Sequence, residues 1–217
     1  MTPGEPLIRW DWIASHVDEF VQRGLQHVEL TVIAVAVGFL IAFALSLLVL
    51  RYRPLEGPVT SITGTLYTIP SLALFALLVP YTGLGVLTAE IGLVSYTLLI
   101  LMRNIVGGIR GVSPDIREAA IGMGYTRRQL LWGIELPLAL AVIVAGVRIA
   151  TVTTIGLVTV TALIGQGGFG ALILSGMLTF FSTEIIAGAV LSVSLAIVAD
   201  ALLVLLQRRL TPWAAAG

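Results

Sequence analysis

The stretch LTVIAVAVGFLIAFALSLLVL, residues 30–50, contains no charged residue and decides the class of fold. As an α-helix with about 1.5 Å per residue it is roughly 31 Å long, which matches the hydrocarbon thickness of a bilayer. Only 11% of the 217 residues are charged and 58% are hydrophobic, well above the apolar share of a soluble domain. The chain is therefore predicted to be an all-α, polytopic membrane protein.

Further apolar segments predict four more crossings, which makes about five in total. They cover, in order, about 56–80, 86–106, 138–164 and 184–206. The first of them is expected to be one helix that ends near Pro80, because Gly83 and Gly85 follow and turn the chain. A short re-entrant or surface helix is expected at 171–183. We see no internal repeat, so residues 28–211 are predicted to form one membrane domain.

The N-terminal segment, residues 1–27, contains more acids than Arg and no long apolar run, unlike the basic start of a signal peptide. We expect this segment to be retained in the mature protein and to lie outside the cytoplasm. Its Trp10 and Trp12 suit a short amphipathic helix at the membrane interface, where Trp is favoured. A mobile polar tail is the alternative. Residues 212–217 are expected to form a short C-terminal tail.

The positions of the Arg residues predict the orientation in the membrane, because short cytoplasmic loops collect positive charge. One side of the five-span arrangement carries Arg51, Arg53, Arg110, Arg117, Arg127, Arg128, Arg208 and Arg209. Only Arg9 and Arg23 fall on the other side. We therefore expect a multi-pass protein of a cell membrane, in contact with its lipids, with the N-terminus outside and the C-terminus in the cytoplasm.

Residues 107–137 form the expected cytoplasmic loop and contain signals for two short helices. The first helix is predicted to start at Ser113, a capping hydroxyl followed by proline, and to end at Gly124. The second is predicted to start at Thr126, which has a capping-box spacing to Gln129. A DNA-reading helix–turn–helix would have to project from a soluble body, whereas membrane spans begin close to both ends of this loop. No nucleic-acid partner is expected.

Within the loop, EAAIGMGYTRRQLLWGIELPL (118–138) carries a spaced signature that ends where the fourth span begins. The signature residues are Glu118, Ala119, Ala120, Gly124, Ile134, Leu136 and Pro137. Their spacing resembles the EAA signature of the permease (transmembrane) subunits of type I ABC importers. The resemblance implies that the first short helix docks into a groove on a cytoplasmic ATP-hydrolysing subunit. It also implies that this coupling loop transmits the motion of that subunit to the spans.

Three more stretches narrow the resemblance to the osmoprotectant importers for glycine betaine, choline and carnitine. They are YTIPSLALFALLVP (67–80), AGVRIATVTTIG (145–156) and ALIGQGGFG (162–170). The resemblance implies a pathway formed by two permease subunits, identical or homologous. It further implies two ATP-binding subunits and an extracytoplasmic substrate-binding protein. A permease of an ABC importer for another small solute, such as an amino acid, methionine or an anion, is the alternative.

The glycines at 165, 167 and 170 fit the dinucleotide-binding fingerprint literally. That fingerprint requires a preceding strand, whereas these glycines follow a membrane span. We interpret the segment instead as a flexible external loop that faces the binding protein, with a plain exit turn as the alternative.

Several other functions are disfavoured by residues that the sequence lacks. It has no Lys, so it cannot supply the lysine of a P-loop, and ATP must be bound by a partner; no cofactor is expected. With no Cys, only two His and no HExxH motif, neither a metal site nor an enzyme is expected. A secondary transporter or channel fits poorly, because the five spans show no inverted repeat.

Hydroxyl groups concentrate in the second and fourth spans, where most side chains would face lipid. Our candidates for a hydrated pathway between two permease copies are Thr63, Tyr67, Pro70, Thr151, Thr154 and Thr159. Neutral hydroxyls would solvate a zwitterion or a quaternary cation without trapping it. Alternatively, each Thr bonds to its own helix or to a neighbouring helix. Pro70 removes a helical hydrogen bond and marks a kink that is either mobile or static.

Arg148 and Asp200 are charged residues inside predicted spans, and the five-span arrangement places them at similar depths. Charges within a membrane usually pair or face water. We expect these two side chains to contact each other, directly or through a water molecule. Lining of the pathway or snorkelling to the interface is the alternative.

Overall fold

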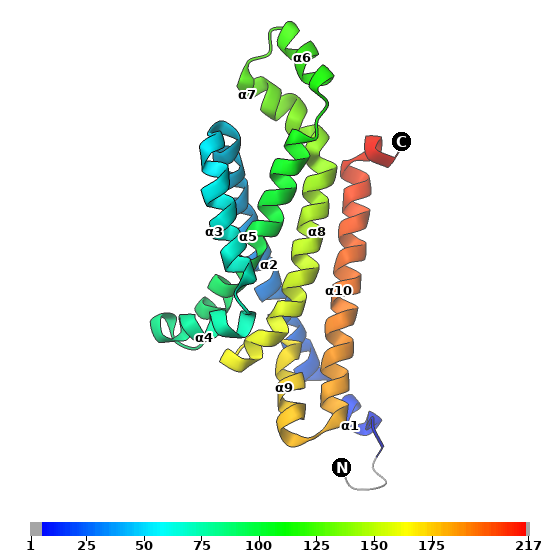
Figure 1. Cartoon of the computed structure of the whole chain (residues 1–217). Coiled ribbons are helices and arrows are strands. Elements are labelled where there is room, and N and C mark those ends of the chain that lie inside the picture. The colour runs from blue at the N-terminus through cyan, green and yellow to red at the C-terminus, as the bar shows by residue number, and fades with distance from the viewer. Residues whose placement is uncertain (1–5, 216–217) are drawn as a thin grey trace.

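The computed structural model describes residues 6–215, and these form helices joined by short connections, without any strand (Figure 1). The main helices are α1 (Trp10–Ser15), α2 (Val17–Arg51), α3 (Glu56–Thr68), α4 (Ser71–Thr82), α5 (Val86–Arg110), α6 (Pro114–Gly122), α7 (Arg127–Leu130), α8 (Leu136–Val160), α9 (Phe169–Thr179) and α10 (Ser182–Leu210). Shorter turns are η1 (Arg53–Leu55), the π-helical η2 (Leu131–Glu135), η3 (Thr161–Ile164) and η4 (Pro212–Ala215). Residues 1–5 of the expected N-terminal segment and residues 216–217 of the expected tail lie outside the described residues.

The described helices confirm the prediction of an all-α fold with about five crossings. Four of them are long and apolar enough to cross a membrane, and a bent pair made of residues 53–68 and 71–82 gives up to five. The helix α10 exposes apolar side chains such as Ile197 and Leu202, as expected for a surface that faces lipid. Figure 1 shows α6 and α7 at one end of the bundle, near the C-terminus, and α1 and α9 at the other. We call these the α6–α7 end and the α1–α9 end.

The core consists of α2, α5 and α8, which approach one another closely at small residues. A Cβ atom added to Gly38 of α2 would lie 1.9 Å from the Thr97 hydroxyl oxygen of α5. A Cβ atom added to Gly146 of α8 would lie 2.4 Å from the Cβ atom of Asn104, also on α5. Lipid gives helices no hydrophobic drive to associate, so close packing at such residues has to hold the bundle together.

The second crossing differs from the prediction of one helix that ends near Pro80. The helices α3 and α4 meet at an angle of 98°, and Pro80 lies inside α4, which continues to Thr82. The break falls at Ile69, whose extended ψ of 128° leaves the helical region. Pro70 explains this conformation, since the proline ring disfavours helical backbone at the preceding residue. The predicted kink is therefore a full break in the span.

The two ends of the chain also differ in detail from their predicted bounds. The helix α2 already begins at Val17, so the expected boundary between residues 27 and 28 lies inside it. Asp18 and Glu19 in its first turn favour this early start, because carboxylates stabilise the positive end of the helix dipole. The short helix expected at 171–183 is α9, and it ends at Thr179 where Phe180 adopts a left-handed backbone conformation.

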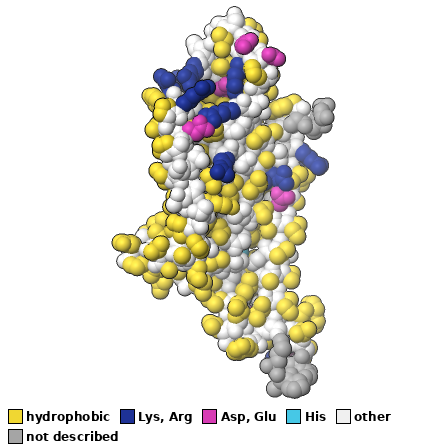
Figure 2. Space-filling view, viewed as in Figure 1, with side chains coloured by type: hydrophobic (Ala, Val, Ile, Leu, Met, Phe, Trp, Pro, Cys, Tyr) yellow, Lys and Arg dark blue, Asp and Glu magenta, His cyan; other side chains and the backbone are white. Residues whose placement is uncertain are grey.

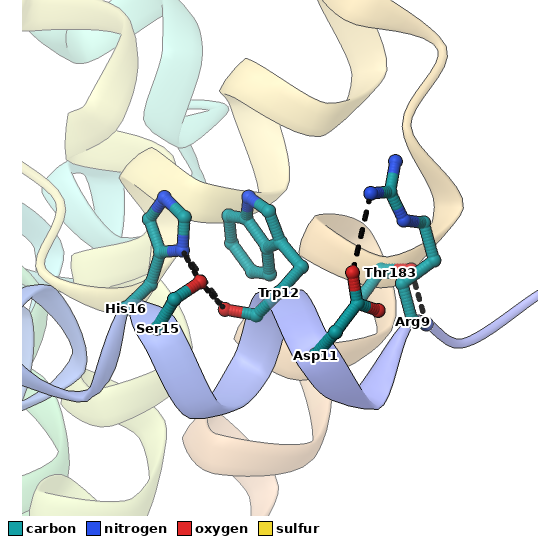
Figure 3. A network of polar contacts seen from close by, with 6 residues as sticks. All are labelled: Arg9, Asp11, Trp12, Ser15, His16 and Thr183. Carbon is teal, nitrogen blue, oxygen red and sulfur yellow. Dashed lines mark hydrogen bonds and ion pairs between the residues drawn. The ribbon is translucent and has the colours of Figure 1, made fainter.

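The segment around α1 is fixed to the first turn of α10, as Figure 3 shows for Arg9 and Thr183. The Arg9 backbone N–H donates to the buried Thr183 hydroxyl over 3.0 Å, and the Trp12 ring meets the Phe181 ring edge-on at 5.1 Å. The Arg9 side chain bonds to Asp11 and holds the pKa of that exposed carboxyl below its ordinary value. Among the described residues, this segment is thus a docked helix and not a mobile tail.

The glycine-rich connection after η3 is likewise fixed, which corrects its interpretation as a flexible loop. The fully buried His27 of α2 donates from Nε2 to the Ile155 carbonyl (3.0 Å), and its Nδ1 accepts from the Phe169 N–H (3.3 Å). The adjacent Gln26 bonds to Gln166 and to the Gly168 N–H. Since one ring nitrogen donates and the other accepts, His27 is neutral in this arrangement.

We expect His27→Leu to lower the stability of the folded chain by about 2–6 kcal/mol. The substitution introduces an apolar side chain of similar size. It leaves a buried carbonyl and a buried N–H without partners, at a cost of about 1–3 kcal/mol each. Thermal unfolding in detergent measures the effect. Val28→Ala, at an exposed neighbouring position, is the control and should melt like the wild type. Equal melting of both variants would show that the two hydrogen bonds contribute nothing.

Candidate functional site

The candidate coupling helix α6 starts and ends as its sequence signals predict. The Ser113 side chain accepts a hydrogen bond from the Asp115 N–H over 3.3 Å and caps the first turn. At the other end, Gly124 adopts φ = 84°, a left-handed conformation that glycine reaches without a Cβ penalty. The Tyr125 N–H then bonds to the Ala120 carbonyl over 3.1 Å. Both ends of the helix are thus defined by local chemistry.

One face of α6 has no partner among the described residues. Ala120 is fully buried and packs α6 onto the rest of the chain. Glu118 and Ala119 are exposed, and a Cβ atom added to Gly122 would meet nothing within 4 Å. Next to them, Ile121 and Met123 are 60% and 70% exposed. This face offers small and apolar groups beside one carboxylate, so the backbone of another protein could approach it closely.

The second helix of the loop continues directly into the membrane. Thr126 and Gln129 form the predicted capping box at the start of α7. From there, residues 127–164 form one helical stretch, which includes the π-helical turn η2. Ile134 and Leu136 are half-buried there, and Pro137 lies exposed in the first turn of α8. Motion of α7 can therefore pass into α8 without an intervening loop.

Arg117 connects α6 to two membrane helices. Its Nε donates to Glu135 over 2.8 Å at the start of α8, and its Nη2 donates to the Ile109 carbonyl near the end of α5. Both partners of the ion pair are largely shielded, with side-chain exposures of 27% and 15%. Because a planar guanidinium binds two acceptors in fixed directions, it holds these three elements in one geometry. The sequence signature contains neither Arg117 nor Glu135.

Two further contacts hold the same end of the bundle together. Arg110 at the end of α5 forms a two-bond ion pair with Glu56 at the start of α3, at 2.5 and 2.8 Å. Arg127 of α7 donates to the Leu50 carbonyl of α2 over 3.0 Å. The α6–α7 pair thus contacts α2, α5 and α8, the three helices of the core.

The candidate pathway residues are divided between exposed and buried positions. The sequence left open the alternative that the Thr hydroxyls bond to their own helices. Three candidates do donate to carbonyls of their own helices: Thr63, Thr151 and Thr159. Thr63 and Thr154 are buried within the chain, at 2% and 1% exposure. Tyr67 is 39% exposed, and Pro70 beside the break is also exposed.

Tyr96 of α5 is a residue at the break that the sequence reasoning missed. Its hydroxyl donates to the Ile69 carbonyl, which cannot find a helical partner because the chain turns there. Its ring also meets the ring of Tyr67 edge-on at 5.9 Å. A carbonyl without a partner at membrane depth costs several kcal/mol, so this hydroxyl stabilises the broken span. Only the presence of a Tyr at membrane depth could have indicated it.

We expect Tyr96→Phe to loosen the connection between α3 and α4. Loss of the hydroxyl leaves the Ile69 carbonyl unpaired at a cost of about 1–3 kcal/mol, so the backbone near the break should open more often. Hydrogen exchange of residues 66–74 should become faster by roughly tenfold or more. The control is Tyr67→Phe, whose hydroxyl makes no hydrogen bond within residues 6–215. The same exchange rate in both variants would contradict this role.

The structure brings Arg148 and Asp200 together in the membrane-spanning part of the chain. Arg148 Nε and Nη2 donate to the two Asp200 oxygens at 2.9 and 3.1 Å, and Nη1 donates to Gln207 at 3.1 Å. Gln207 in turn donates to the Ala141 carbonyl over 3.0 Å. This network is a principal polar connection between α8 and α10, and it compensates a charge that would otherwise face lipid.

We expect Arg148→Asp and Asp200→Arg each to reduce the yield of folded chain, and the double reversal to restore most of it. Each single change leaves two like charges in contact; because the pair is partly exposed, the cost should be at most about 3 kcal/mol. Size-exclusion chromatography measures the folded fraction. Arg209→Asp, outside the network, should behave like the wild type. Failure of the double variant to recover would show that the pair does not hold α8 to α10.

No group of His, Asp and Glu side chains that could hold a metal ion lies within residues 6–215. What the fold does provide is a helical membrane body with a fixed helix pair, α6 and α7, at one end. That combination defines a helical membrane protein with one helix face, on α6, that has no partner among the described residues.

The chain belongs to the family described as "binding-protein-dependent transport system inner membrane component", whose profile matches residues 34–212. It is thus a membrane component of a transport system and not an enzyme.

Two curated relatives are similar over most of their length. The choline transport system permease protein OpuBB of Bacillus subtilis is 37% identical over 201 residues, which cover 93% of each chain. The osmoprotectant import permease protein OsmW of Salmonella typhimurium is 41% identical over 192 residues, 86% of this chain and 89% of its own. Among solved structures, the inward-facing MetNI methionine ABC transporter matches 91% of this chain and 98% of its own with a TM-score of 0.83. At 20% identity this last likeness establishes the fold of an ABC importer permease and no more.

Proposed function

We propose that this chain is the membrane-spanning subunit of an ATP-driven importer for osmoprotectants, meaning quaternary ammonium solutes such as glycine betaine, choline and carnitine. The observation that carries the proposal is the similarity, over 86–93% of the chain, to permeases named for choline and osmoprotectant import. The contacts of α6 agree with it, because they connect an unpartnered helix face to the helices of the membrane core.

In this proposal the unpartnered face of α6 receives one of two ATP-binding subunits. Glu118 would pair with a partner arginine, while Ala119 and Gly122 allow the two backbones to approach closely. Motion of the partner would reach α5 through the bond of Arg117 to Ile109, and would reach α8 through Glu135. ATP is bound by the partner, and this chain needs no cofactor of its own.

We further propose that the α6–α7 end lies in the cytoplasm. Eight of the Arg residues, including Arg110 and Arg208, fall on this side of the predicted arrangement, and positive charge marks cytoplasmic loops. The N-terminus is then outside, and the α1–α9 end faces the extracytoplasmic binding protein. The fixed connection 165–168 would present a preformed surface to that protein.

The pathway in this proposal lies between two permease subunits, identical or homologous. The exposed Tyr67 and Pro70 beside the α3–α4 break, with the partly exposed Thr151 and Thr159, would line it. Since the hydroxyls of Thr151 and Thr159 donate to their own helices, their oxygen lone pairs would face the solute as neutral acceptors. Such groups solvate a cation without neutralising it.

The solute is tested by uptake into proteoliposomes that contain the permease, its ATP-binding subunits and the cognate binding protein. We expect ATP-dependent accumulation of at least one of glycine betaine, choline and carnitine, and none of methionine or other amino acids. Thermal shift of the binding protein with the same solutes measures selectivity independently. Accumulation of methionine or an anion alone would identify another solute class, and uptake without ATP would indicate a secondary transporter.

Coupling and orientation are tested with a cysteine at Met123, because the chain contains no other thiol. We expect Met123→Cys to cross-link to an ATP-binding subunit and to react with a membrane-impermeant thiol reagent only when the cytoplasmic side is open. A cysteine at the exposed Leu178 of α9 is the control and should show the opposite sidedness. Labelling of Met123→Cys from outside intact cells would overturn both proposals.

A further inference from the structure

A pocket of about 500 Å³ lies at the α6–α7 end and is lined by arginine and leucine side chains. The pocket is bordered by the end of α2, the turns η1 and η2, the end of α5, and the helices α6 and α7. The arginines that line it are Arg51, Arg53, Arg110, Arg117, Arg127 and Arg128. Figure 2 shows dark-blue side chains gathered near this end of the molecule. The volume of the pocket lies within the range of roughly 300–1,000 Å³ that is typical of ligand sites.

The pocket carries more positive charge than the described chain neutralises. Arg110 is paired with Glu56, and Arg117 is paired with Glu135. The other four guanidinium groups form no ion pair with a carboxylate among residues 6–215. The Arg53 side chain in particular makes neither a hydrogen bond nor an ion pair within that range. Four uncompensated guanidinium groups around one cavity attract an anion, and their planar forks match the geometry of phosphate oxygens.

The apolar part of the lining indicates what kind of phosphate fits. The same wall includes the apolar side chains of Leu47, Leu50 and Leu131. A free phosphate ion would gain nothing from these side chains. A phospholipid would place its headgroup among the arginines and the start of its acyl chains against the leucines. The combined lining therefore favours a lipid over a soluble anion.

Aromatic residues beside the pocket place it at headgroup depth. Trp132 follows the pocket residue Leu131, is 54% exposed and packs on Phe43 of α2, with the rings 6.2 Å apart. Tyr52 lies between two of the pocket arginines and is 52% exposed. Exposed Trp and Tyr side chains are enriched at the boundary between hydrocarbon and water, where their rings meet lipid and their polar groups meet water.

We propose that this pocket binds the phosphate headgroup of an anionic phospholipid, such as phosphatidylglycerol, with the leucines holding the start of its acyl chains. Basic pockets between membrane helices on the cytoplasmic side have the right chemistry for such headgroups. The lipid would bridge α2, α5 and the α6–α7 pair, the same elements that Arg117 and Arg127 connect. The proposal depends on the chain being a membrane protein and not on the solute it transports.

Native mass spectrometry of the purified full-length chain tests the proposal, with phosphatidylglycerol and phosphatidylcholine of identical acyl chains as probes. We expect the wild type to retain phosphatidylglycerol preferentially and R51Q/R53Q to lose that retention by on the order of tenfold, since each Arg contributes about 1 kcal/mol to binding of anionic lipid. R208Q/R209Q removes two Arg residues near the end of α10, outside the pocket, and is the matched control. It should retain the lipid like the wild type.

Four results would overturn the proposal. Equal lipid retention by R51Q/R53Q and the wild type, or an equal loss in R208Q/R209Q, would show that the pocket is not the site. Displacement of the lipid by millimolar inorganic phosphate would identify a site for a soluble anion. Loss of the ATP-binding subunits from R51Q/R53Q with unchanged lipid retention would assign the arginines to a protein contact. Should R51Q/R53Q misfold, as judged by circular dichroism, Arg53→Gln alone serves instead, because Arg53 makes no contact that the fold requires.

Discussion

The bilayer core offers no water, and this absence constrains each polar group that the chain places there. Helices satisfy the constraint wherever the backbone is regular. Where the backbone is irregular, side chains from other helices supply the missing partners. Tyr96 of α5 donates to the carbonyl at the α3–α4 break, and His27 of α2 bonds to both sides of the glycine-rich connection. These two contacts connect elements that are distant in sequence, so they also determine how the helices pack.

The same constraint explains the pairing of two charges between α8 and α10. Arg148 and Asp200 neutralise each other between α8 and α10, and Gln207 satisfies a further guanidinium N–H. At the α6–α7 end, charge is instead concentrated and only partly paired, because headgroups and water are available there. That end of the bundle therefore carries both the contacts that fix α6 and the pocket that attracts an anion.

A helix that transmits force has to be stiff along its length and firmly attached at its base. The cap at Ser113 and the left-handed Gly124 define α6, and Arg117 attaches it to α5 and α8. The continuous helix from residue 127 to residue 164 extends this attachment into the membrane. In the proposed function, such an arrangement would convert a displacement at α6 into a rearrangement of the core.

Local patterns in the sequence were sufficient to predict the membrane class, about five crossings, the two short helices of the loop and the signature in it. Uncharged runs, capping residues and turn glycines act over a few residues, so their effects can be read without the rest of the fold. The complete break at Pro70, the fixed glycine connection and the roles of Tyr96, His27 and Arg117 were decided only by the tertiary structure. The contacts that hold these features join residues 8 to 142 positions apart in the chain, and the sequence does not state which unsatisfied polar group a distant side chain will reach.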